Sequence, residues 1–119
     1  MPSEVIHTCL VRAKMCKEIG KLQNKTSSDT GYFMTGLFSL MDSILGIPTE
    51  KILKDLPITD EVSHALKGND NHHKQVLNLV ITVKNGEWST VSEQSKAHHI
   101  KESDVYHIYR KSLKWSVEL

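Results

Sequence analysis

Residues 31–48 read Gly-Tyr-Phe-Met-Thr-Gly-Leu-Phe-Ser-Leu-Met-Asp-Ser-Ile-Leu-Gly-Ile-Pro. This stretch is apolar on nearly every side of a helix, which is typical of a helix at the centre of a bundle. Gly46 and Pro48 end it, because glycine followed by proline is a common stop at a helix C-terminus. Gly36 lies inside the run, where glycine is less stable than alanine by roughly 1 kcal/mol and is tolerated at close helix contacts. We therefore predict a central helix over residues 30–45 with a packing contact at Gly36.

Similar start and stop signals divide the rest of the chain into short helices. Ser3 can cap a first helix, and a polar loop over residues 23–29, rich in Ser, Thr, Asn and Lys, is expected to be flexible. Residues 72–85 are rich in β-branched side chains, but their length and the lack of a partner strand favour a helix. The predicted fold is all-α, a compact bundle of six to seven short helices forming a single domain over residues 1–119. The other helices are expected over residues 49–55, 60–67, 88–97 and 103–117, with a bend at 98–101.

Charge and composition narrow the classes of partner and compartment. The 119 residues carry 15 basic and 14 acidic side chains, too balanced to attract nucleic acid or an anionic membrane over a broad surface. The apolar stretch Leu37–Ile47 is far shorter than the roughly 20 residues that a spanning helix needs, and no export signal is visible. Cys9 and Cys16 would lie about 10 Å apart on one helix, too far for a disulfide. We therefore expect a cytoplasmic protein with reduced, buried thiols and no membrane insertion.

The order and spacing of five segments resemble the HDOD domain, which bacterial signalling proteins carry C-terminal to an EAL domain. The match is to the later half of that domain and covers nearly the whole chain. The segments are Val-Arg-Ala-Lys-Met-Cys at 11–16, Tyr-Phe-Met-Thr-Gly-Leu-Phe-Ser-Leu-Met-Asp at 32–42, Leu-Pro-Ile-Thr-Asp-Glu-Val at 56–62, Gly-Glu-Trp at 86–88 and Tyr-Arg-Lys-Ser-Leu-Lys-Trp at 109–115.

The resemblance implies an HD-superfamily-related helical fold and a non-catalytic output or regulatory role in a cyclic di-GMP signalling protein. Any phosphodiesterase activity would then belong to an EAL domain outside this chain. The implied partners are other proteins or the rest of a longer chain. A half domain would also expose apolar surface on its first two helices, so we expect a homo-oligomer through the helix 30–45 and part of the first helix. The stripe expected in that contact is Ile6, Cys9, Ala13 and Cys16.

The sequence contains neither of the catalytic motifs that the resemblance brings into question. None of the six aspartates follows a histidine, so the His-Asp dipeptide of HD phosphohydrolases is missing, and so is the EAL motif. The pairs His72-His73 and His98-His99 diverge by about 100° on a helix, which does not present two nitrogens to one ion. We expect solvent-exposed histidines, no catalytic residue, no cofactor and no metal. The alternative is a degenerate or fragmentary metal-dependent phosphohydrolase or phosphodiesterase that uses these pairs.

Asp42 is an acid within the apolar helix, where an ionised carboxylate needs a partner. It either belongs to a ligand or partner site or is satisfied inside the bundle by Ser39, a backbone amide or Arg12; we favour the second. Tyr109 and Trp115 share the last helix with several lysines and an arginine, a mixture that could bind nucleic acid. Ordinary amphipathicity, with an inward stripe of Val105, Ile108, Tyr109 and Leu113, is the preferred interpretation. The candidate interaction or structural positions are Arg12, Gly36, Asp42, Tyr109 and Trp115.

Overall fold

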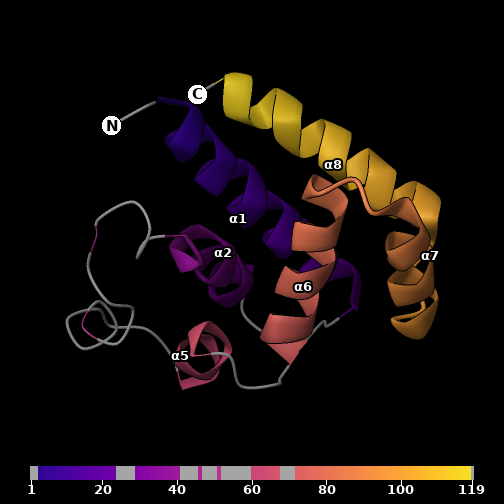
Figure 1. The fold of residues 1–119 in the computed structure, drawn as a ribbon, viewed down its shortest axis with the longest axis horizontal. Helices are drawn as coiled ribbons and strands as arrows, with labels where there is room; N and C mark the ends of the chain where they lie inside the picture. The colour runs from indigo at the N-terminus through magenta and orange to yellow at the C-terminus, as the bar shows by residue number, and fades with distance from the viewer. Residues whose placement is uncertain are drawn as a thin grey trace.

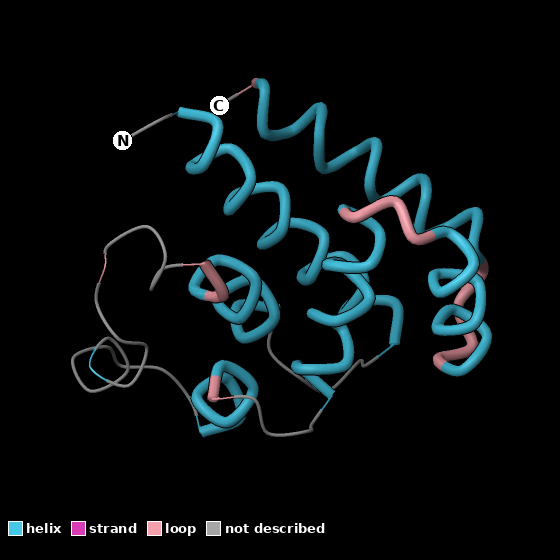
Figure 2. The backbone as a smooth tube through the Cα atoms, in the orientation of Figure 1, coloured by secondary structure: helices cyan, strands magenta, loops and turns pink. Residues whose placement is uncertain are grey.

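The computed structural model describes residues 3–23, 29–40, 46, 51, 60–67 and 72–118. Within these residues the chain forms six α-helices and no strand, as Figure 2 shows. The predicted all-α class is therefore confirmed. The helices are α1 (Ser3–Gln23), α2 (Asp29–Phe38), α5 (Asp60–Leu66), α6 (His72–Lys84), α7 (Trp88–Ala97) and α8 (Glu102–Val117) (Figure 1).

The central helix among those described is α1, which contacts α2, α6 and α8. Its buried side chains surround most of the helix: Val11, Met15 and Ile19 are fully buried in addition to the smaller Cys9, Ala13 and Cys16. Only part of the helix predicted over 30–45 is described: α2 ends at Phe38, and residues 39 and 40 form a turn. In that part Tyr32 and Thr35 are fully buried, and Phe33 and Leu37 are half-buried. The central position of this helix therefore stays a prediction.

α1 and α8 run antiparallel, side by side (Figure 1). Near one end, Ser116 Oγ lies 2.6 Å from Nε2 of His7 in a hydrogen bond. Further along, Lys111 Nζ lies 3.8 Å from a carboxylate oxygen of Glu18. These two contacts, one near the start of α1 and one in its second half, define the antiparallel register of α1 and α8.

The buried stripe of α8 agrees in part with the predicted one. Val105 and Ile108 are buried, and Tyr109 and Leu113 are half-buried against the core. The stripe also contains Ser112 and Ser116, both buried. Such small side chains let α8 approach α1 closely.

α6 is a helix despite its β-branched residues, as predicted, and it contributes a run of buried apolar side chains to the core. Gly86 ends it in the left-handed conformation, with φ of +72°. The amide of Gly86 donates to the carbonyl of Val83, and the amide of Glu87 donates to that of Thr82. This pair of bonds is the Schellman motif, which satisfies carbonyls at a helix end.

The bend between α7 and α8 has the same pair of backbone hydrogen bonds, but a residue other than glycine takes the left-handed conformation. His99 takes φ of +58°, its amide donates to the carbonyl of Lys96, and the amide of Ile100 donates to that of Ser95. Ile100 then packs against the core. The predicted bend at 98–101 is therefore confirmed, and it turns the chain from α7 into α8.

The other predicted helices over 60–67, 72–85, 88–97 and 103–117 agree with α5, α6, α7 and α8 to within a residue at each end. The helix predicted over 49–55, apart from Lys51, and most of the loop predicted over 23–29 lie outside the described residues. Gln23 is the last residue of α1 and Asp29 the first of α2. No helix in the described ranges is both long and apolar enough to span a membrane.

Candidate functional site

Arg12 and Gly36 lie together where α1 crosses α2. The Arg12 guanidinium donates a hydrogen bond to Oγ of Ser39 at 3.1 Å, and Ser39 in turn donates to the carbonyl of Gly36. A Cβ atom on Gly36 would come within 2.8 Å of the Arg12 carbonyl oxygen. The close approach expected at Gly36 is therefore present. Asp42, the acid proposed as a partner for Arg12, lies outside the described residues.

Arg12 is half-buried between α1 and α2. Among the described residues its Nε has no hydrogen-bond partner, and burial lowers the pKa of its guanidinium. Burial and the positive charge of Arg12 also lower the pKa of Lys84 on α6. The Lys84 ammonium lies 5.9 Å from the centroid of the Tyr109 ring. The Tyr109 ring therefore makes a cation–π contact with the Lys84 ammonium.

Trp115 joins three helices. Its ring meets that of Phe33 on α2 edge to face, with centroids 6.4 Å apart, and the ammonium of Lys14 on α1 lies 5.3 Å from its centroid. Such contacts each contribute of the order of 1 kcal/mol. In the described structure Trp115 and Tyr109 contact protein side chains, as the amphipathic interpretation of α8 requires.

The prediction of solvent-exposed histidines is wrong for His73. Its side chain is only 4% exposed, and its ring stacks on Tyr32 with centroids 4.3 Å apart. The sequence gives no signal for this burial, because His73 follows another histidine in a polar segment. His64, His99 and His107 are exposed, as expected.

Over the part of the chain that the structure describes, no group of three or more His, Cys, Asp or Glu side chains is arranged to hold an ion. His98 and His99 lie in the bend rather than on a helix, and His99 has left-handed backbone geometry. The alternative of a metal-dependent hydrolase therefore gains no support from these residues.

The first-helix stripe proposed as an oligomer contact is mostly covered by the chain itself. Cys9, Ala13 and Cys16 are buried, and only Ile6 is exposed. This part of the predicted interface is therefore wrong, because α2 and the other neighbours of α1 already occupy the space. The two thiols are free and buried, as predicted. Burial raises the pKa of both, to about 12 for Cys16.

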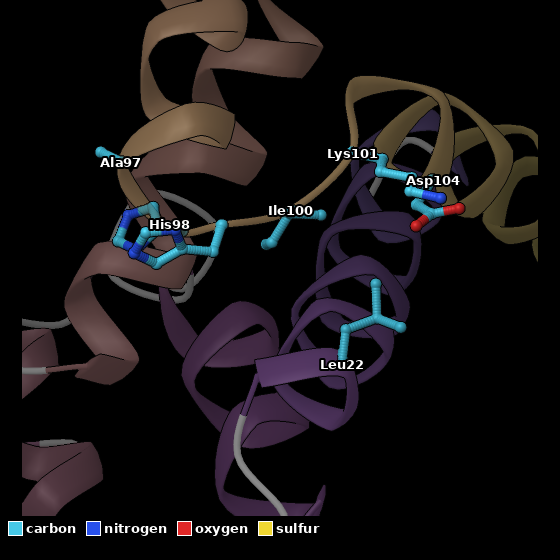
Figure 3. A pocket seen from close by; sticks show the side chains of 7 residues that line it. Leu22, Ala97, His98, Ile100, Lys101 and Asp104 are labelled. Atoms are coloured by element: carbon cyan, nitrogen blue, oxygen red, sulfur yellow. The ribbon is translucent and has the colours of Figure 1, made fainter.

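Two hollows open where the end of α1 meets the α7–α8 bend. The first has a volume of about 580 Å³ and lies between Leu22, the bend and Asp104. Figure 3 shows Ile100 between His98 on one side and Lys101 with Asp104 on the other, and Leu22 projecting from α1. The second, of about 290 Å³, continues between α1 and α8. Both are lined by Leu22 and Asp104, so we treat them as one groove, called the bend groove.

Sequence reasoning missed the bend groove. Its residues come from the last turn of α1 and from residues 97–111, which only tertiary packing brings together. The sequence offers one local signal, the apolar Leu22 beside Lys21 at the end of the α1 apolar pattern. In the structure this side chain is 52% exposed. A large apolar side chain at that exposure marks a contact surface only when neighbouring apolar residues surround it.

Comparisons with known proteins were made for the whole chain. It is 33% identical over 112 residues to an uncharacterised protein of Bacillus subtilis (strain 168), YuxH; the match covers 94% of this chain and 27% of YuxH. It is 23% identical over 118 residues to the cyclic di-GMP phosphodiesterase CdgJ of Vibrio cholerae, covering 99% of this chain and 27% of CdgJ. The chain thus spans about a quarter of the length of either relative. None of the known family models matches it, and no solved structure does.

Proposed function

We propose that this chain is the later part of an HDOD domain and acts as a non-catalytic interaction module in a cyclic di-GMP signalling protein. The observation that carries the proposal is the alignment: nearly all of the chain matches a single quarter of a cyclic di-GMP phosphodiesterase. A match over 94% of this chain covers about a quarter of a second, longer bacterial protein.

The chemistry of the residues supports a non-catalytic role. Phosphodiester hydrolysis commonly relies on metal ions held by convergent carboxylates and imidazoles, and the sequence has neither a His-Asp dipeptide nor an EAL motif. The side chains singled out by sequence pack against protein instead: Arg12 bonds Ser39, and Trp115 contacts Phe33 and Lys14. The function of such a module lies in its contacts with other polypeptide, either a partner protein or the remainder of a longer chain. We propose that it works in the cytoplasm.

Two measurements on the 119-residue chain test the non-catalytic part. Calorimetric titration with cyclic di-GMP should show no binding at micromolar concentration, and a turnover assay with Mg²⁺ or Mn²⁺ should show no hydrolysis above a buffer blank. The His98→Ala/His107→Ala variant provides the matched control, because it removes one imidazole from the lining of each of the two hollows. Turnover that survives repurification and disappears in this variant would establish the hydrolase alternative and reject the proposal.

A further inference from the structure

Polar and apolar side chains both line the bend groove, and its second hollow is mainly apolar. Leu22 from α1, Ile100 from the bend and Ile108 from α8 line it, together with Ala97. No Phe, Tyr or Trp lines it among the described residues. Nucleic acid binding without base pairing relies on aromatic side chains that stack on bases. The lining therefore fits aliphatic side chains of a protein better than nucleobases.

The rim of the groove carries an excess of positive charge. Lys21, Lys101 and Lys111 line it, against Glu18 and Asp104. Glu18 is already paired with Lys14, at 3.2 Å, outside the groove lining, and with Lys111 on the rim. The hydrogen bond and charge of Lys14, with the charges of Lys111 and Lys21, outweigh burial and keep the pKa of Glu18 below its usual range. Three lysines against two acids leave the groove lining with one positive charge in excess.

The spacing of these charges selects an extended partner. Lys101 precedes α8 and Lys111 lies in its third turn, so about 15 Å of helix separates them at 1.5 Å per residue. A small anion reaches only one of these lysines at a time. A peptide of three or four helical turns presents several carboxylates over that distance and apolar side chains between them. The groove lining also includes His98, His99 and His107.

We propose that the bend groove binds an acidic, amphipathic polypeptide segment, with leucine-like side chains against Leu22 and Ile100 and carboxylates against Lys21, Lys101 and Lys111. The inference rests on the proposed interaction role and names the chemistry of the partner. The start of α8 already has acids in its first turn, which offset the helix dipole. The lysine side chains, rather than the helix terminus, provide the recognition.

The test uses a fluorescein-labelled 15-residue peptide of Glu, Ala and Leu, with leucines at three- and four-residue steps, and fluorescence anisotropy with the 119-residue chain. Matched peptides replace every Glu by Gln or by Lys. We expect the acidic peptide to bind at least tenfold more tightly than the Gln version, and the Lys version not to bind. Equal binding of the acidic and Gln peptides, or none of the acidic one, would overturn the proposal.

Variants locate the site. Lys101→Glu should weaken binding of the acidic peptide about fivefold, as reversal of a rim charge does, and Leu22→Ser should weaken it similarly. Lys67→Glu, an equal charge change at an exposed position beyond α5, should leave affinity within twofold. Circular dichroism checks that each variant is folded. Equal effects of Lys101→Glu and Lys67→Glu on peptide affinity would reject the groove as the site. Displacement of the labelled peptide by a 15-nucleotide single-stranded DNA as effective as displacement by unlabelled acidic peptide would also reject it.

Failure of this inference differs from failure of the proposed function. The peptide assay reports only on the bend groove, whereas the turnover and titration assays report on catalysis by the chain. No acidic-peptide binding together with no turnover would reject the groove alone. Peptide binding together with genuine turnover would reject the non-catalytic role while keeping the groove.

Discussion

Gly36 of α2 meets the backbone of Ala13 of α1 so closely that a Cβ atom at Gly36 would lie 2.7 Å from the Ala13 Cα. Real Cβ atoms essentially never approach a neighbouring atom to under 3.0 Å. The obstacle is backbone rather than the end of a flexible side chain, so it cannot rotate away. The contact places the most apolar helix of the sequence directly on the central helix of the described structure.

We predict that Gly36→Ala destabilises the chain by about 1–3 kcal/mol, since overpacking of this size forces the two helices apart. Helix propensity alone predicts the opposite sign, because alanine is favoured over glycine in a helix by about 1 kcal/mol. Chemical denaturation measures the difference. Lys96→Ala, at an exposed position of α7, should change stability by less than about 0.5 kcal/mol. A Gly36→Ala variant as stable as the natural chain would contradict the contact.

His99→Gly should stabilise the chain by about 1 kcal/mol. His99 has φ of +58°, a conformation that disfavours residues with a Cβ and suits glycine at the C-terminus of a helix. His98→Gly is the matched control, because His98 has φ of −95° and gains nothing from glycine there. Thermal melts of the two variants should move in opposite directions. Destabilisation by both substitutions would show that the bend lacks this strain.

Stability should fall at alkaline pH through Cys16. The unfolded thiol loses its proton near the usual 9.0, whereas burial holds the folded pKa at about 12. Between these values the folded state binds one proton more than the unfolded state, so the free energy of unfolding decreases as pH rises, by up to about 1.4 kcal/mol per pH unit. Below pH 9 this contribution is fully present.

Cys16→Ala isolates this effect from other groups that titrate in the same range. Urea denaturation of both chains at pH 7, 9 and 10.5 gives the comparison. The difference in unfolding free energy between the natural chain and the variant should stay constant up to pH 9 and then decline for the natural chain. Parallel curves over the whole range would contradict the assigned burial.

Local features of this sequence predict which residues form helices better than they predict how those helices pack against one another. Gly86 marks a helix end because only its own backbone conformation is involved, and the helical identity of residues 72–84 follows from length. The centrality of α1 depends on Val11 and Met15, which lie off the predicted stripe and are buried by neighbours far away in sequence. The burial of His73 likewise depends on Tyr32.

The candidate site residues also differ in how far the sequence alone predicts their roles. Gly36 could be interpreted from sequence because a glycine inside an apolar helix indicates close packing, while the role of Arg12 depends on which helices surround it. The bend groove required the end of α1 and the start of α8 to be placed together. No periodicity or motif encodes that juxtaposition.

The central claim, that this chain is an interaction module of a cyclic di-GMP signalling protein, is tested most directly by a graft. The matched quarter of CdgJ is deleted, or replaced by this chain, and cyclic di-GMP hydrolysis by the two proteins is compared with that of intact CdgJ. We expect the deletion to change the rate and the graft to bring it back toward the intact value. A graft indistinguishable from the deletion, in a folded protein, would contradict the claim.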